Sequence, residues 1–209
     1  MAYDDEEQLE ALRHWWARYG RGVVIGLVVA LVAVLGYQQW QSWQSRQLGA
    51  ASADHSAVLA ALDQDEVETA ANRVAIMQQE HGQTAQAALA TLAVAGALVE
   101  TGAAEQAARQ LAWVTDAQAG TALADIARLR QGEALAAAGK TTAALDVLQP
   151  LPDGQLRGRF LELQGDLQQM AGDARAAAAA YADALEQTTG QRRSLVEIKL
   201  NNLGGAPES

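Results

Sequence analysis

Apolar and polar positions follow two different patterns along this chain. From Gly22 to Ser45, 24 consecutive residues carry no formal charge, and the first two thirds of this stretch are almost wholly aliphatic. After Arg46, apolar residues recur at helical spacing in runs that end at glycine, aspartate or proline. We therefore predict an all-α protein, with one N-terminal transmembrane helix followed by an α-solenoid of stacked helical hairpins.

The uncharged stretch predicts a transmembrane anchor helix over residues 22–43. A tail of residues 1–21 precedes it, a helical domain follows over 44–203, and residues 204–209 form a frayed C-terminus. Two other interpretations stay open: a buried core helix, or a signal peptide cleaved at Ala51-Ser52-Ala53, although that site lies well beyond the apolar run. Aromatic rings that favour the membrane interface flank the stretch. These predicted anchors are Trp15, Trp16, Tyr19, Tyr37, Trp40 and Trp43.

Basic residues predict the orientation of this anchor. Arg13, Arg18 and Arg21 precede the span, whereas Arg46 is the one basic residue in the twenty positions after it. Because the more basic flank stays in the cytoplasm, we expect a cytoplasmic N-terminus and, in a bacterial inner membrane, a periplasmic C-terminal domain. Small residues at Gly22, Gly26 and Ala30 form a stripe that is a possible contact with another transmembrane helix.

The domain after the anchor is predicted to be a row of antiparallel helices joined by short connections. A glycine follows four of these helices, where the chain needs a left-handed conformation: Gly82, Gly102, Gly139 and Gly172. The predicted helices span residues 47–62, 65–81, 84–101, 103–118, 120–138, 141–149, 155–171, 173–189 and 191–203.

Three of these glycines reveal an internal repeat with spacings of 37 and 33 residues. A small residue stands seven positions before each glycine, an alanine five positions after it, and a larger side chain nine positions after it. The predicted packing residues are Ala95, Gly102, Ala107 and Leu111, then Gly132, Gly139, Ala144 and Leu148, then Gly165, Gly172, Ala177 and Tyr181. This pattern resembles the tetratricopeptide repeat, whose period is 34 residues. A plain helical bundle is the alternative.

Composition supports helices and limits the classes of partner. Alanine occupies 47 of the 209 positions, and the chain has one phenylalanine and no cysteine. The formal charge is −10, which disfavours nucleic acid as a partner because phosphates attract cationic surfaces. The absence of cysteine excludes disulfides and thiol nucleophiles.

Residues that would support catalysis are scattered. His14, His55 and His81 stand apart from one another, so the sequence predicts no catalytic, cofactor-binding or metal site and no enzyme activity. Stacked hairpins instead create a concave groove that suits a polypeptide. The helix at 155–171, which carries Arg157, Arg159, Phe160 and Gln164, is a candidate for the inner wall of that groove.

Six stretches of the chain form a pattern through their order and spacing: residues 3–12, Trp15-Trp16, Tyr19-Gly20, residues 36–40, residues 87–90 and residues 195–203. Together they resemble a bacterial family, the ancillary SecYEG translocon subunits. Asn201 and Asn202 depart from the acidic residues expected at that end of the family pattern.

The resemblance implies a single-pass inner-membrane protein with a periplasmic tetratricopeptide-like domain. It also implies association with the SecYEG channel, with a membrane-anchored periplasmic chaperone of the prolyl-isomerase type, and with unfolded exported polypeptides. A membrane anchor would raise the effective concentration of the domain near a membrane partner, so that weak contacts between the two would suffice for binding. A scaffold for another envelope complex, in cell-wall or cytochrome assembly, shares the same physical features, and a tethered hydrolase is the third hypothesis.

Overall fold

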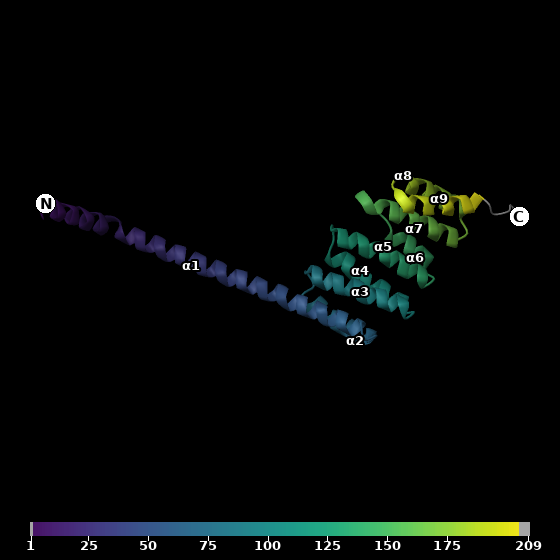
Figure 1. The fold of residues 1–209 in the computed structure, drawn as a ribbon, viewed down its shortest axis with the longest axis horizontal. Coiled ribbons are helices and arrows are strands. Elements are labelled where there is room, and N and C mark those ends of the chain that lie inside the picture. Colours follow the sequence, from purple (N-terminus) through teal and green to yellow (C-terminus); the bar gives the residue numbers. More distant parts are fainter. Residues whose placement is uncertain (1, 205–209) are drawn as a thin grey trace. The chain divides into compact units, whose positions relative to one another are not determined.

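The computed structural model describes the backbone of residues 2–204, and side chains within that range except for 2–15, 20–25, 28–29 and 41–48. The described residues form helices and turns, with no strand. The predicted all-α architecture of helical hairpins is therefore confirmed for the described residues (Figure 1). The helices are α1 (Ala2–Leu62), α2 (Val67–Glu80), α3 (Ala85–Glu100), α4 (Ala104–Ala117), α5 (Ala122–Ala137), α6 (Thr141–Val147), the 3-10 helix η1 (Gly154–Leu156), α7 (Arg157–Met170), α8 (Ala174–Glu186) and α9 (Gly190–Gly204).

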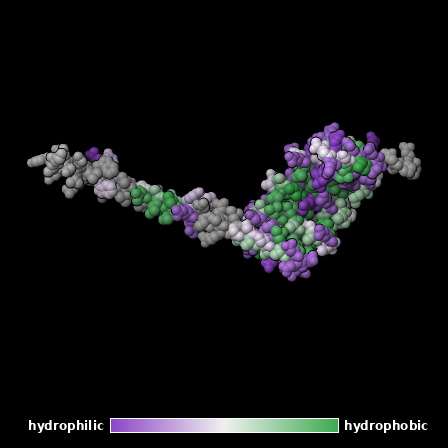
Figure 2. All heavy atoms as spheres, viewed as in Figure 1, coloured by the Kyte–Doolittle hydropathy of each residue, from purple (hydrophilic) through white to green (hydrophobic). Residues whose placement is uncertain are grey.

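The chain divides into two compact units, residues 1–50 and residues 51–209. Helix α1 forms the first unit, and its last turns belong to the second. The described side chains at residues 30–40 of α1 are exposed, and hydrophobic ones gather along the middle of this helix (Figure 2).

The predicted transmembrane helix at 22–43 is not identified in the structure. Among the residues that the structure describes, no helix combines the length and the apolar content needed to cross a membrane. Part of the predicted span, residues 22–25, 28–29 and 41–43, has side chains outside the described set.

Successive hairpins of the second unit pack side by side. Helix α3 contacts α2, α4 and α5, helix α5 contacts α4, α6 and α7, and helix α8 contacts α7 and α9. The first helices of consecutive hairpins, α3, α5 and α7, thus lie next to one another as well as against their own partners (Figure 1). This neighbour pattern is that of a helical-repeat stack, in which each repeat touches the ones beside it.

Turn glycines set the ends of several helices. Gly102, Gly139 and Gly172 have φ values of +84°, +74° and +83°, the left-handed conformation that glycine adopts without strain. Gly82 differs from the prediction, because it does not have a positive φ. Glycine fits at this position because the backbone of Gln78 lies close to it. A Cβ at Gly82 would lie 2.5 Å from the carbonyl oxygen of Gln78.

Two clusters of buried apolar side chains form the core of this unit. The larger runs from the end of α1 to α7 and consists mainly of alanine, leucine and valine. The smaller lies between α7, α8 and α9 and contains Leu161, Ala177, Tyr181, Ala184 and Val196. The last hairpin and its final helix therefore have a small apolar cluster of their own.

Polar side chains link the helices at two places within the larger cluster. The Gln78 amide of α2 donates to Thr91 of α3 at 3.2 Å and to Gln110 of α4 at 2.8 Å. The Arg128 guanidinium of α5 donates to the backbone oxygens of Val147 and Pro150 and lies 5.1 Å from the centre of the Phe160 ring. These contacts fix the positions of the helices relative to one another, which the small and uniform alanine side chains alone would not determine.

Candidate binding groove

A hollow of about 450 Å³ opens along the first helices of three consecutive hairpins. Helices α3, α5 and α7 form its walls because each occupies the same place in its own hairpin. We call this hollow the groove. Its lining residues are Ala95, Gly96, Val99, Glu100, Leu111, Ile126, Leu129, Arg130, Glu133, Ala134, Leu156 and Arg159.

Small side chains make room for the groove, and larger apolar ones coat it. Ala95 and Ala134 are buried beneath it, and Val99 is exposed on its surface. Gly96 leaves the groove open at this point, because a Cβ placed there would meet no atom within 4 Å. A larger side chain at this position would project into open space and fill the groove.

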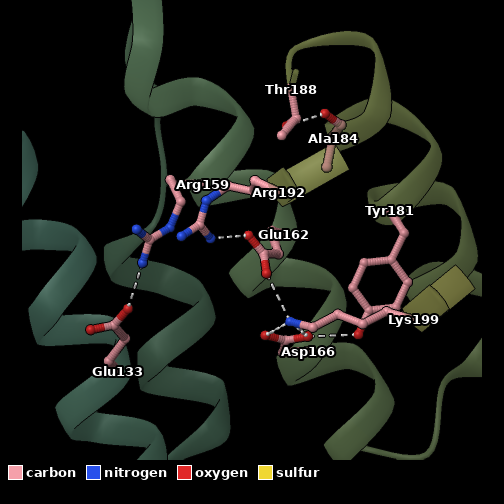
Figure 3. A network of polar contacts seen from close by, with 9 residues as sticks. All are labelled: Glu133, Arg159, Glu162, Asp166, Tyr181, Ala184, Thr188, Arg192 and Lys199. Carbon is pink, nitrogen blue, oxygen red and sulfur yellow. Dashed lines mark hydrogen bonds and ion pairs between the residues drawn. The ribbon is translucent and has the colours of Figure 1, made fainter. Parts of the chain in front are cut away.

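Four charged side chains line the groove. Arg159 of α7 reaches Glu133 of α5, with a nitrogen–oxygen distance of 3.4 Å (Figure 3). Glu100 and Arg130 are exposed, and no ion pair is found for either among the described residues. The arrangement offers both donors and acceptors beside an apolar surface, which suits a polypeptide with apolar side chains and a polar backbone.

A second polar feature, which we call the α7–α9 ion cluster, lies at the last hairpin (Figure 3). The Lys199 ammonium donates to Glu162 at 2.9 Å and to both carboxylate oxygens of Asp166 at 2.7 Å. Arg192 donates to the other oxygen of Glu162 at 2.7 Å, and the Tyr181 hydroxyl donates to Asp166 at 2.7 Å. Every acidic group in the cluster is therefore matched by a donor.

Burial and charge oppose each other in the ion cluster. Burial alone would raise the pKa of Glu162, but hydrogen bonds from Lys199 and Arg192 outweigh it and hold the pKa below its usual value. Burial alone would lower the pKa of Lys199, yet Asp166 and Glu162 raise it above its usual value. Burial and the neighbouring Asp166 raise the pKa of Tyr181, which stays a neutral donor. The cluster is charged and paired at neutral pH.

The predicted repeat-packing residues lie at helix contacts within their hairpins. Ala107, Ala144 and Ala177 are completely buried. A Cβ at Gly165 would lie 2.4 Å from the Tyr181 ring, and one at Gly132 would lie 3.1 Å from Leu148. Ala95 and Leu111 lie together along the groove.

The predicted membrane residues fall in the first unit. Trp16, Arg18, Tyr19, Tyr37 and Trp40 are exposed, and the last two rings lie 6.2 Å apart. Gly26 and Ala30 are also exposed. The remaining predicted residues of this unit have side chains outside the described set, namely Arg13, Trp15, Arg21, Gly22 and Trp43.

The side chains suggested for the inner wall from the sequence lie in different places in the structure. Arg159 lines the groove, whereas Phe160 is completely buried in the core. Glu100 and Arg130 also line the groove and were not singled out, although both lie on exposed faces of α3 and α5. The ion cluster was missed too, and its signal was acidic residues four apart at Glu162 and Asp166.

A metal centre is not found in the described part of the chain. No group of three or more histidine, aspartate or glutamate side chains there could hold a metal ion. His81 lies 3.5 Å from Asp54, and His55 is on the same helix as Asp54. The groove and the ion cluster both invite a functional explanation.

Comparison with known proteins gives one family and two relatives. The model of a family described as a tetratricopeptide repeat-like domain matches residues 13–205. A Haemophilus influenzae protein named ancillary SecYEG translocon subunit is 26% identical over 205 residues, covering 97% of this chain and 100% of the relative. An Aggregatibacter actinomycetemcomitans protein of the same name is 26% identical over 209 residues, with the same coverage. The family resemblance drawn from the sequence is confirmed.

Proposed function

This chain belongs to the tetratricopeptide repeat-like domain family, and from that premise we propose that it is a non-catalytic accessory subunit of a SecYEG protein-export channel. One observation carries the proposal. Two proteins named ancillary SecYEG translocon subunit resemble 97% of this chain and are themselves covered over 100% of their length. A similarity of that extent includes the N-terminal helix as well as the helical repeats.

We propose further that residues 22–43 anchor the protein in the bacterial inner membrane. The uncharged stretch and its aromatic flanks support this anchor. The basic residues Arg13, Arg18 and Arg21 support a cytoplasmic N-terminus and a periplasmic repeat domain. In that position the groove faces the compartment into which exported chains emerge.

The groove supports a role in binding polypeptides. Its apolar walls suit exposed side chains of an unfolded chain, and its charged rim suits peptide groups. We propose that it contacts a membrane-anchored periplasmic chaperone of the prolyl-isomerase type and exported polypeptides. Tethering at the channel lets weak contacts suffice, because the partner is held at high local concentration.

Affinity purification from detergent-solubilised membranes tests the proposal. With the tagged chain at its native level, we expect the SecYEG channel and the chaperone to be recovered together with it. Recovery of neither would reject the proposal. Recovery of cell-wall or cytochrome assembly proteins instead would favour the scaffold alternative.

A groove-filling variant tests the part of the proposal that concerns the groove. Gly96→Leu adds a side chain whose Cβ has no atom within 4 Å, at a residue that lines the groove. We expect it to reduce recovery of the chaperone and of exported polypeptides several-fold while the helical content is unchanged. Ala182→Leu, at an exposed position of α8, adds the same side chain away from the groove and is the control. Equal recovery with both variants would place the binding surface elsewhere.

A further inference from the structure

The last helix, α9, covers the end of the helical stack. It packs against α8 and reaches α7 through long charged side chains. Beneath it lie Leu161 of α7 and Ala177, Tyr181 and Ala184 of α8, which form the small apolar cluster with Val196. We call this surface of α7 and α8 the end face.

The contribution of α9 to the apolar cluster is small. Val196 is the one residue of α9 that is buried among those described, and Leu200 and Leu203 are partly buried beside it. Leu195 and Ile198 on the other side of the helix remain exposed. Since one buried valine and two partly buried leucines make up this packing, apolar contacts alone hold the helix weakly.

Charge supplies the specificity of the contact. Glu162 and Asp166 of the end face are four residues apart on α7 and accept from Arg192 and Lys199 of α9 at 2.7–2.9 Å (Figure 3). Glu162 is 5% exposed, so that the cations of α9 neutralise a carboxylate with little access to water. The end face is therefore apolar in the middle and anionic along its α7 edge.

The side chains of α9 that meet this face follow a simple pattern. Arg192, Val196 and Lys199 are spaced four and three residues apart, which places them on one stripe of the helix. The cations meet the anionic edge, and the valine enters the apolar middle. Basic, apolar and basic side chains at these spacings are therefore the pattern with which a helix meets this face.

We propose that the end face is a docking site for a basic amphipathic helix, which α9 fills within the same chain and which a partner helix of this pattern fills when α9 is released. Ion pairs at a partly open surface weaken as salt rises, and an element with few buried contacts opens before the rest of the domain. The proposal is independent of the groove and of the channel.

Charge reversal of α9 tests the proposal directly. In the full chain, Arg192→Glu with Lys199→Glu sets two acids against Glu162 and Asp166 and should release α9. The probe is a fluorescent peptide of residues 188–204 with the natural sequence, and its binding is followed by anisotropy. Because apparent affinity scales with the fraction of open site, we expect the variant to bind the peptide about tenfold or more tightly than the unaltered chain does.

Two controls separate docking from general effects of charge. Arg73→Glu with Arg175→Glu changes the net charge equally at exposed arginines for which the described residues offer no ion pair, and it should bind the peptide no better than the unaltered chain. A peptide carrying Arg192→Glu and Lys199→Glu should not bind the released site. Equal binding of both peptides, or binding of neither to a folded variant, would overturn the proposal.

Hydrogen exchange of the unaltered chain gives a result that does not depend on the variant. Between low salt and about 1 M salt, where the Debye length falls to about 3 Å, we expect amides of α9 to exchange several-fold faster while those of α8 change little. If α9 exchanges only together with α7 and α8 at every salt concentration, it is a fixed part of the hairpin and the proposal is wrong.

Discussion

At the scale of single residues, glycines in the first helices decide how closely the hairpins pack. A Cβ at Gly165 would meet the Tyr181 ring at 2.4 Å, and that ring is fixed because its hydroxyl binds Asp166. At Gly132 the nearest atoms are methyl groups of Leu148 and Leu163 at 3.1 Å and 3.2 Å, which can shift by a small rotation. Gly96 faces open space.

These surroundings predict a graded series of alanine variants. Gly165→Ala should lower the free energy of unfolding by about 1–3 kcal/mol through overpacking, and Gly132→Ala should lower it less. Gly96→Ala should raise it by up to about 1 kcal/mol, because alanine favours the helix and nothing is displaced. Urea unfolding of the full chain in mild detergent measures all three. Equal effects at Gly165 and Gly96 would contradict the packing explanation.

The carboxyl of Glu162 predicts a dependence of stability on pH. Its pKa in the folded chain lies below the usual value of about 4.3, since Lys199 and Arg192 outweigh its burial. A lowered pKa means that the group stabilises the fold above about pH 4.3, and that this contribution is lost as pH falls through the lower folded value. Lys199, whose pKa is raised by Asp166 and Glu162, stays protonated throughout this acidic range.

Glu162→Gln is the matched variant, because glutamine keeps the shape and cannot pair with two cations. We expect it to be less stable than the unaltered chain at pH 7 and to approach it as pH falls below about 4. Asp166, Arg192 and Tyr181 also face this group and are present in both chains, so the difference isolates Glu162. Thermal unfolding at several pH values measures it, and a constant difference from pH 7 to pH 3 would contradict the assignment.

At the scale of helices, capping side chains fix where some elements begin. The Asp173 carboxylate accepts from the Ala176 amide at 2.9 Å at the start of α8, whereas Asp153 precedes η1 and its side chain makes no such bond. Asp173→Ala should lower the free energy of unfolding by about 1 kcal/mol. Asp153→Ala should change it by less than about 0.5 kcal/mol. Urea unfolding compares them, and equal losses would reject the capping role of Asp173.

Helix positions in the second unit were accessible from the sequence because local signals determine them. The predicted ends after residue 62 lie within three residues of the observed ones, since glycine and aspartate act within a single turn. The left-handed conformation predicted for Gly82 was wrong, because this glycine is constrained by its close approach to Gln78 and not by a positive φ. The helix predicted at 47–62 is the end of a helix that begins at Ala2, because no glycine cap or proline interrupts it.

The candidate sites were less accessible, because they depend on contacts between residues far apart in the chain. Arg192 and Glu162 are separated by 30 positions, and no local pattern pairs them. The groove requires the register of α3, α5 and α7, which depends on contacts between these helices such as Gly132 of α5 against Leu163 of α7. The sequence therefore predicted a groove along stacked helical hairpins. The packing of the helices determines which side chains line that groove.

At the scale of the whole molecule, the proposed function depends on the side of the membrane that holds the repeats. Acidic groups outnumber basic ones by ten in the chain, yet the orientation of a membrane anchor follows the basic residues beside it, and Arg13, Arg18 and Arg21 lie on the N-terminal side of the proposed anchor. A domain that binds emerging chains works only where those chains emerge. Topology is therefore a test that the proposed channel role must pass.

Protease treatment of spheroplasts measures that topology. With a tag at the C-terminus, we expect added protease to remove the repeat domain from intact spheroplasts, because the outer face of the inner membrane is accessible to it. Exchanging Arg13, Arg18 and Arg21 for glutamine and placing three arginines after residue 43 should favour the reverse orientation, since basic residues stay in the cytoplasm. The repeats should then survive until the spheroplasts are lysed. Survival of the unaltered chain before lysis would place its groove on the wrong side of the membrane for exported polypeptides, and the role at the export channel would have to be abandoned.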